Sequence, residues 1–215
     1  MNITLFLIGA VFSYLLGSLP SAVWYGKAFF GIDVREHGSG NAGATNTFRV
    51  LGSKAGIVVM LLDVLKGWTA TSMAYILVYL DYVPLDYVIA FQLTYGIIAV
   101  LGHIFPIYVG FKGGKGVATL LGMVLSIHTQ AALLCMLIFL VVFLLSHYVS
   151  LGSMIAALAF PLIMLIPRFS PDEPLTIIFG FIIFAIVVLT HQKNIVRLIN
   201  GQENKIRINL KKNKK

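Results

Sequence analysis

Residues 175–190 read LTIIFGFIIFAIVVLT, an apolar run without a charged side chain. A helix needs about 20 mostly apolar residues to cross a bilayer, and comparable runs recur along the whole chain. Of the 215 residues, 59% are hydrophobic and only 11% are charged, which is roughly half the charged share of a soluble domain. We therefore predict an all-α fold, a polytopic transmembrane helical bundle.

The apolar runs predict about seven spans: Ile3–Phe30, Ile57–Leu80, Tyr87–Val109, Val117–Ile127, Ala131–His147, Leu151–Ile166 and Leu175–Thr190. The fourth run is short, so the span count between residues 115 and 148 is open. The start, MNITLFLIGA, has neither a basic region nor a small-residue cleavage site, so we expect a retained first span. Residues 1–215 are predicted to form a single integral-membrane domain with a flexible basic tail at 204–215. A single cysteine, Cys135, excludes an intramolecular disulfide.

Charge divides the connecting segments into two groups. Of the 16 basic residues, only Arg168 lies in the acidic loops at 81–86 and 167–174, which hold half of the 8 acidic residues. Lysine and arginine are retained on the cytoplasmic side of short loops. We therefore predict that the N-terminus lies outside and the C-terminus in the cytoplasm.

The first basic segment, HGSGNAGATNTFR at 37–49, is dense in glycine, hydroxyl and amide groups. Glycines permit tight turns whose N–H groups can enclose an anion, and Arg49 adds a planar fork suited to phosphate or carboxylate. A flexible polar loop is the alternative. The candidate binding residues are Ser39, Gly40, Asn41, Thr45, Asn46 and Arg49.

The second segment, GHIFPIYVGFKGGKGVAT at 102–119, leads a glycine-rich stretch into an apolar run. It does not fit the phosphate-binding pattern G-x-x-x-x-G-K-[ST] of soluble nucleotide-binding proteins. A helix N-terminus still offers free N–H groups and partial positive charge to a phosphate whose attached chain lies in the bilayer. A basic loop at the membrane edge is the alternative. The candidates are His103, Lys112, Gly113, Gly114, Lys115 and Gly116.

The third segment, HQKNIVRLINGQENK at 191–205, continues the last predicted span. His191, Asn194 and Arg197 are spaced by three residues and so share a helix face, while Glu203 lies past the expected helix end. Asp63 and Lys66 have the same spacing inside the second run. Charges at membrane depth are usually paired or functional, and we interpret these two as a structural pair.

Several chemistries are not supported by the sequence. It contains no Cys/His cluster, H-E-x-x-H, G-x-S-x-G or H-x-x-x-x-D pattern, and no basic stripe with interleaved aromatics. We expect no metal, no cofactor and no nucleic-acid partner. An organophosphate transporter would use similar basic glycine loops, but internal repeats are typical of transporters and none is visible here. A non-catalytic anion-binding subunit is a third alternative.

Three motifs together resemble the bacterial acyl-phosphate:glycerol-3-phosphate acyltransferase family. They are GSGNAGATNTFR, GHIFPIYVGFKGGKGVAT and HQKNIVRLINGQE, and YVSLGS at 148–153 and LDVLKG at 62–67 also look like family features. The resemblance implies a multi-pass bacterial inner-membrane enzyme with a cytoplasmic active site. It implies transfer of the acyl group of acyl phosphate to the 1-hydroxyl of sn-glycerol 3-phosphate, giving 1-acylglycerol 3-phosphate and phosphate.

By similarity, the catalytic residues are Ser39, Arg49, Lys115, His191 and Asn194. Arg49 and Lys115 would bind phosphate, the loop glycines would offer N–H groups, and Ser39 would orient substrate. Either His191 or a phosphate oxygen of the acyl donor would take the hydroxyl proton. The other candidates above, with Arg197, would bind substrate, and no role is assigned to Asp63, Lys66, Ser150, Ser153 or Glu203. The expected partners are the two substrates and membrane lipids, and the chain is expected to be a monomer.

Overall fold

The computed structural model describes residues 3–171 and 173–206. Within these ranges the chain is helical and has no strand. The α-helices are α1 (Ile3–Gly17), α2 (Ser21–Phe30), α3 (Ala44–Leu51), α4 (Ser53–Ser72), α5 (Ala74–Tyr79), α6 (Val88–Ile104), α7 (Val117–Ile127), α8 (Thr129–Ser146), α9 (Val149–Met164), α10 (Leu175–Thr190) and α11 (Gln192–Ile199). Single 3₁₀ turns are η1 (Val34–Glu36), η2 (Leu85–Tyr87), η3 (Ile107–Val109) and η4 (Pro167–Phe169).

The helices satisfy the length and composition of a membrane bundle. Three stretches of the described chain, Ser53–Tyr79, Leu85–Val109 and Thr129–Ser146, are long and apolar enough to span a bilayer. The pairs α1–α2 and α10–α11 qualify when each is taken as one bent span, and α7 and α9 are shorter apolar helices. The all-α prediction is confirmed, whereas the number of crossings stays a prediction.

Two segments that were predicted to be continuous are bent in the structure. The run Ile3–Phe30 divides into α1 and α2, which are bent by 42° around residues 18–20. Pro20 has no N–H group, and it disfavours helical geometry at Leu19, so the helix ends there. The last span does not continue smoothly into residues 191–199 either, because α11 turns away from α10 by 65°.

Close contacts between glycines and backbone hold the central helices together. A methyl group at Gly122 of α7 would lie 1.9 Å from the carbonyl oxygen of Val64 in α4, and one at Gly67 would lie 2.1 Å from that of Thr119. Gly17 of α1 meets the backbone of Ala99 in α6 in the same way. Small residues permit such close approach where lipid removes the hydrophobic drive between helices. These contacts fix where α7 begins, and so where Lys115 lies.

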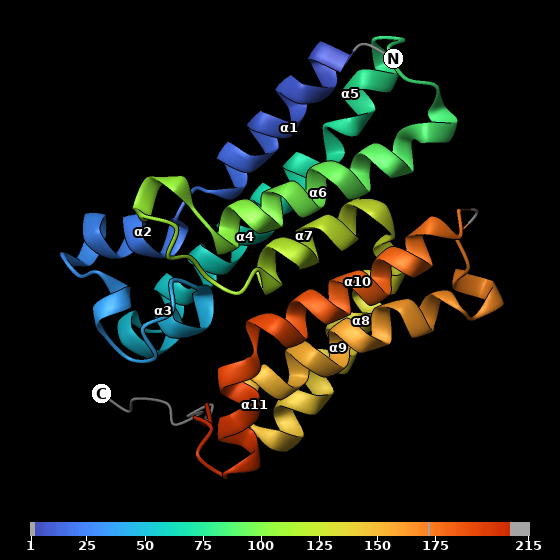
Figure 1. Cartoon of the computed structure of the whole chain (residues 1–215). Helices are drawn as coiled ribbons and strands as arrows, with labels where there is room; N and C mark the ends of the chain where they lie inside the picture. Colours follow the sequence, from blue (N-terminus) through green and yellow to red (C-terminus); the bar gives the residue numbers. More distant parts are fainter. Residues whose placement is uncertain (1–2, 172, 207–215) are drawn as a thin grey trace.

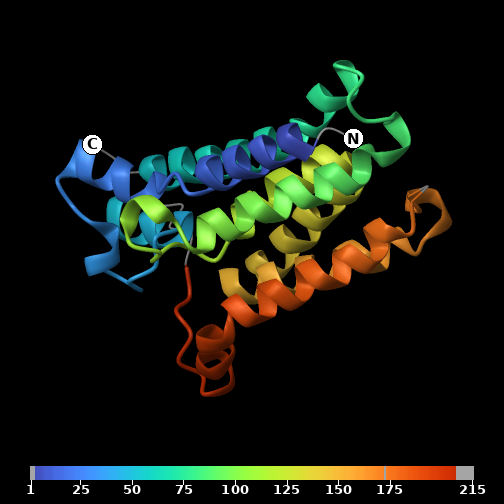
Figure 2. The same ribbon diagram turned by 45° about the horizontal axis from the view of Figure 1, so that its top comes forward.

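The connecting segments gather at two ends of the bundle. Figure 1 places α2, α3, the α6–α7 loop and α11 at one end, while the N-terminus and the α5–α6 and α9–α10 connections lie at the other; Figure 2 shows the same division. The three basic motifs therefore meet at one end, hereafter the basic end. The acidic loops lie opposite.

Part of the predicted flexible tail is held against this end. The N–H group of Ile206 donates to the carbonyl oxygen of His147 at 3.0 Å, and the Lys205 ammonium lies 5.3 Å from the ring centre of Tyr148. Residues 205 and 206 thus contact the α8–α9 connection, and the flexibility of the tail stays a prediction. Residues 207–215 lie outside the described chain.

Candidate active site

The first motif folds around the side chain of Asn46. Its Nδ2 donates to the carbonyl oxygens of Val34 at 2.7 Å and His37 at 3.0 Å, and its Oδ1 accepts the N–H of Ser39 at 2.8 Å. Asn46 is only 1% exposed. Its amide is therefore used by the loop, where it positions Ser39. Its contact with substrate stays a prediction.

This loop presents its other candidates near the surface. Ser39 and Arg49 are exposed, Asn41 and Thr45 are half-buried, and Gly40 has a φ of +72° that only glycine adopts easily. Arg49 approaches Asn46 Oδ1 at 3.5 Å, at the margin of a hydrogen bond. The Ser39 hydroxyl and most of the Arg49 guanidinium are thus left for a ligand.

The first loop is also tied to the second through an arginine that sequence reasoning did not single out. Arg35 donates to both Asp33 carboxylate oxygens and to the carbonyl oxygen of Val109 at 3.0 Å. The Arg35 hydrogen bonds hold the pKa of Asp33 well below its usual range. One signal for this role of Arg35 was present in the sequence, namely that a charged residue lies beside the first motif.

The glycines of the second motif pack onto the end of α6. The N–H groups of Gly113 and Gly114 donate to the carbonyl oxygens of Ile104 and His103, each at 3.2 Å. These two N–H groups are therefore not free for a phosphate, contrary to our expectation. A methyl group at Gly113 would lie 2.0 Å from the His103 carbonyl oxygen, so close packing explains the glycine.

The N-terminus of α7 does offer free donors. Gly116 has a φ of +80°, and the first helical hydrogen bond runs from Leu120 N–H to its carbonyl oxygen at 2.7 Å. The N–H groups that precede Leu120 in this helix have no intrahelical acceptor, and the helix dipole is positive here. Lys115 lies directly before this turn. The geometry suits an anion bound at 116–119.

The third motif closes on itself through Glu203. Its Oε1 accepts hydrogen bonds from Ser150 at 2.7 Å and Asn194 at 2.5 Å, while Oε2 accepts from Arg197 Nε at 2.8 Å. The turn at Gly201, with a φ of +66°, returns the chain to α11. Burial alone would raise the pKa of Glu203, but these three hydrogen bonds outweigh it and lower the pKa. Ser153, by contrast, donates within its own helix to Val149.

Lys115 joins the second and third motifs. Its ammonium donates to Oδ1 of Asn194, whose Nδ2 is held by Glu203. Burial, together with the positive charges of Arg197 and Arg49, lowers the pKa of Lys115 to about 8, although Glu203 opposes the shift. The charges of Arg197 and Arg49 therefore act on the Lys115 ammonium.

His191 lies at the bend between α10 and α11 and is 2% exposed. Its Nδ1 lies 2.7 Å from the Val187 carbonyl oxygen, which can only accept, so Nδ1 carries the proton. Burial and the nearby charge of Lys115 lower the pKa of His191 to about 4. The ring is thus neutral with Nε2 as an acceptor, and within the described chain Nε2 makes no hydrogen bond.

Two predicted residues stand apart from this group. Lys112 is exposed and lines an open polar cleft of about 510 Å³ with Asp33, Arg35, Glu36 and Gly40. His103 is buried beneath the second motif and faces Asp63, and its role in substrate binding stays a prediction. Asp63 and Lys66 form the predicted pair at 2.9 Å.

The arrangement can bind phosphate beside a hydroxyl. Arg49, Lys115 and Arg197 supply positive charge, the start of α7 supplies N–H groups, and neutral His191 supplies an acceptor. No group of three or more metal-ligating side chains occurs in residues 3–171 and 173–206.

Comparison with known proteins identifies the family. The glycerol-3-phosphate acyltransferase family model matches residues 7–201. The chain belongs to this family. It is 41% identical to the glycerol-3-phosphate acyltransferase of Chlorobium phaeobacteroides (strain BS1), over 95% of this chain and 97% of the relative. It is 44% identical to the glycerol-3-phosphate acyltransferase of Listeria welshimeri, over 96% of this chain and 99% of the relative.

Two solved structures share the fold. Both are crystal structures of PlsY, an integral membrane glycerol 3-phosphate acyltransferase. The glycerol 3-phosphate form is 35% identical, with a TM-score of 0.81 over 94% of this chain and 96% of PlsY. The lysophosphatidic acid form is 36% identical, with the same TM-score over 94% of this chain and 95% of PlsY. The chain is therefore an integral membrane acyltransferase, and phospholipid synthesis follows from its family.

Proposed function

We propose that this enzyme transfers the acyl group of acyl phosphate to the 1-hydroxyl of sn-glycerol 3-phosphate. The observation that carries the proposal is the hydrogen bond from Lys115 to Asn194, which joins the second and third motifs at one end of a membrane bundle, where the positive charges of Arg49 and Arg197 also act on Lys115. Glycerol 3-phosphate and lysophosphatidic acid are named for the two PlsY forms. Acyl phosphate is a mixed anhydride with a negatively charged phosphate. It therefore suits a site that has several cations and a neutral histidine.

The reaction needs no covalent enzyme intermediate, because acyl phosphate is already activated. The hydroxyl oxygen attacks the carbonyl carbon, the bond from that carbon to the phosphate oxygen breaks, the phosphate leaves with the electron pair of that bond, and the hydroxyl proton passes to a base. The protein holds two anions together and orients the hydroxyl, which can supply several kcal/mol. Lys115, Arg49 and the α7 N-terminus stabilise charge on the departing phosphate. Ser39 is proposed to orient substrate by a hydrogen bond.

Two groups can take the hydroxyl proton, namely Nε2 of His191 and an oxygen of the donor phosphate. The pKa of about 4 makes His191 neutral at physiological pH but a weak base before substrate binds. We expect His191→Gln, which keeps a hydrogen-bond acceptor, to separate the two. A loss of about 10²–10⁴ in kcat is typical of a missing general base. A smaller loss in kcat, with an unchanged pH profile, would indicate that an oxygen of the donor phosphate takes the hydroxyl proton.

The proposed site lies on the cytoplasmic side of a bacterial inner membrane, where the positive-inside rule places the basic end. The enzyme is proposed to act as a monomer among membrane lipids.

The donor can be tested directly. Purified protein in detergent receives labelled glycerol 3-phosphate with either palmitoyl phosphate or palmitoyl-CoA, and labelled lysophosphatidic acid is measured. We expect product with the acyl phosphate alone, since the sequence lacks the H-x-x-x-x-D pair. Comparable turnover with palmitoyl-CoA, in a preparation free of other acyltransferases, would refute the donor assignment.

A further inference from the structure

Three ionisable side chains are buried in the helices below the proposed site. Asp63 and Lys66 of α4 are 1% and 3% exposed, and His103 of α6 is 6% exposed. Charged groups inside a membrane bundle are costly and are retained where they are paired or used. None of the three contributes to the reaction as described above, so their role needs its own explanation.

Asp63 is the centre of this triad. Its Oδ1 lies 2.9 Å from the Lys66 ammonium, 3.0 Å from the Ser21 hydroxyl and 3.6 Å from Nδ1 of His103. The carboxylate thus connects α2, α4 and α6 at a single atom. The distance from His103 exceeds that of a hydrogen bond, so the imidazole is oriented by the charge of Asp63 and by packing.

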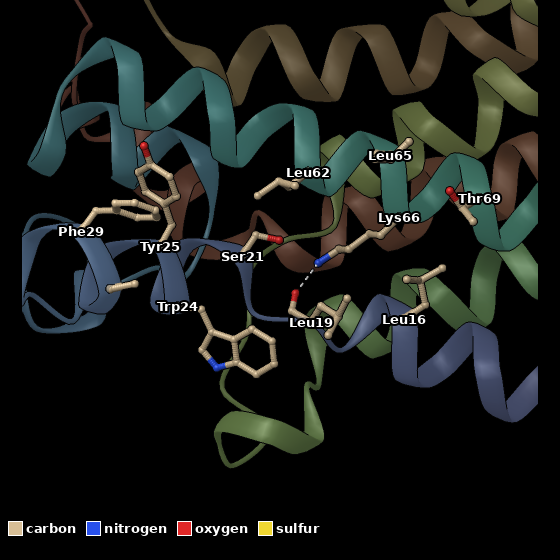
Figure 3. Close-up of a pocket in the computed structure, with 11 residues that line it drawn as sticks. Leu16, Leu19, Ser21, Trp24, Tyr25, Phe29, Leu62, Leu65, Lys66 and Thr69 are labelled. Carbon is tan, nitrogen blue, oxygen red and sulfur yellow. Dashed lines mark hydrogen bonds between the residues drawn. The ribbon is translucent and has the colours of Figure 1, made fainter.

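Lys66 extends the triad to the break between α1 and α2. Its ammonium donates to the Leu19 carbonyl oxygen at 2.9 Å. Figure 3 shows this bond beside an apolar cavity of about 430 Å³, which Lys66 and Ser21 help to line. Irregular backbone at membrane depth needs an internal partner for its polar groups. Lys66 supplies one at the bend.

His103 makes the contact that leads to the site. Its carbonyl oxygen accepts the Gly114 N–H at 3.2 Å, and its ring lies against Gly114. A methyl group at position 114 would lie 2.2 Å from Nε2 and 3.1 Å from two ring carbons. One residue therefore provides both a hydrogen-bond acceptor and a wall for the residue that precedes Lys115.

We propose that His103, oriented by Asp63, is a positioning residue that holds the Gly114–Lys115 turn so that Lys115 faces Asn194 and the bound phosphate. This role rests on the proposed function, because it acts through Lys115. Lys66 and Ser21 fix the carboxylate that orients the imidazole. The triad thereby links the position of Lys115 to the packing of α1, α2, α4 and α6.

A kinetic cycle tests the proposal in the full-length enzyme. KM for each substrate and kcat are measured for wild type, His103→Gln, Lys115→Ala and the double variant. We expect His103→Gln to raise by about three- to tenfold the same KM that Lys115→Ala raises, and to leave the other KM unchanged. In the Lys115→Ala background it should add less than about twofold.

A matched histidine supplies the control. His128 caps α8, where its Nδ1 accepts the Ala131 N–H at 3.2 Å, and lies in the α7–α8 connection away from the basic end. His128→Gln makes the same chemical change and should leave both KM values unchanged. Equal effects of His103→Gln and His128→Gln would overturn the proposal, and so would additive losses in the cycle.

If His103→Gln does not fold, Gly114→Ala provides a second test of the proposal. The φ of Gly114 lies outside the left-handed region, so an alanine there is not strained by its backbone, and the three atoms nearest to its methyl group belong to the imidazole. We expect it to displace the turn and to raise the same KM as Lys115→Ala; an unchanged KM would overturn the proposal. Inactivity of the wild type with both substrates would instead refute the proposed function.

Discussion

At the scale of single residues, Lys112 and Lys115 differ in exposure and in hydrogen bonding, although they lie only three positions apart in the sequence. Both satisfy the positive-inside rule, but Lys112 is exposed at the edge of a polar cleft, whereas Lys115 is partly buried and donates to Asn194. Only Lys115 adjoins the free N–H groups of α7. The structure therefore supports different roles for the two ammonium groups.

Alanine substitutions test this difference. We expect Lys115→Ala to lose roughly ten- to a hundredfold more activity than Lys112→Ala, because a charge-assisted contact is worth about 1.5–3 kcal/mol. Lys115→Arg should also be impaired, since a planar fork replaces a compact ammonium. Steady-state kinetics with both substrates varied, at matched expression and membrane insertion, provide the measurement. Equal and mild losses for the two alanine variants would reduce this loop to a membrane-edge marker.

The pH dependence of the reaction should report the charge of Lys115. Because its pKa is lowered to about 8, the ammonium is charged below that pH and loses its proton above it. We expect kcat/KM, which reports the free enzyme, to fall as the pH rises through about 8. Arginine stays charged over this range, so Lys115→Arg should remove the alkaline fall although its activity is lower.

A substitution of Glu203 provides a second test of the pH dependence of kcat/KM. Its negative charge raises the pKa of Lys115, so Glu203→Gln should lower that pKa further and move the alkaline fall to lower pH. The comparison requires that the thermal midpoint of unfolding be unchanged by the substitution. An alkaline fall that persists in Lys115→Arg, or that does not move in Glu203→Gln, would assign the titration to another group.

At the scale of elements, the packing of α7 on α4 should be the contact most sensitive to a methyl group. We expect Gly122→Ala to lower the thermal midpoint in detergent more than Gly180→Ala. The added methyl would lie 1.9 Å from the backbone oxygen of Val64 in the first case and 2.9 Å from a side-chain atom of Pro161 in the second. Alanine favours the helix equally at both sites, and overpacking costs about 1–3 kcal/mol. A larger loss for Gly180→Ala would contradict this packing.

The elements that sequence predicted well are those that hydropathy alone determines. The runs Val117–Ile127 and Leu175–Thr190 coincide with α7 and α10. The other long runs also fall on helices, although Ile3–Phe30 divides into α1 and α2 and Ile57–Leu80 into α4 and α5. Helix α3 was missed, since its eight residues are too few to form a long apolar run and its place depends on Asn46, which fastens the preceding loop. The bend at His191 was also missed, because no proline or glycine marks it.

The candidate site was predicted less completely than the helices. Spacing brought His191, Asn194 and Arg197 to one face, but it could not show that Glu203 returns to join Asn194, Arg197 and Ser150. The glycines at 113 and 114 were interpreted as anion donors because sequence shows composition and not the acceptor of each N–H group. Contacts between distant segments decide both points.

At the scale of the whole molecule, the distribution of charge predicts how the bundle lies in the membrane. Lys54 at the start of α4 and Lys205 after α11 belong to the basic end, whereas Asp81 lies in the α5–α6 connection at the opposite end (Figure 1). Asp172, also expected outside, is not among the described residues. From the positive-inside rule we predict that the basic end faces the cytoplasm.

Single cysteines can report this orientation in intact cells. With Cys135 replaced, cysteines at 81 and 172 should react with a membrane-impermeant thiol reagent, and those at 54 and 205 should react only after the membrane is opened. Cys135 itself is buried in α8, so its replacement by alanine removes background without touching either end. Labelling at 205 but not at 81 would reverse the orientation. The basic site would then face away from the cytoplasm, and both proposed substrates would have to reach it from outside the cell.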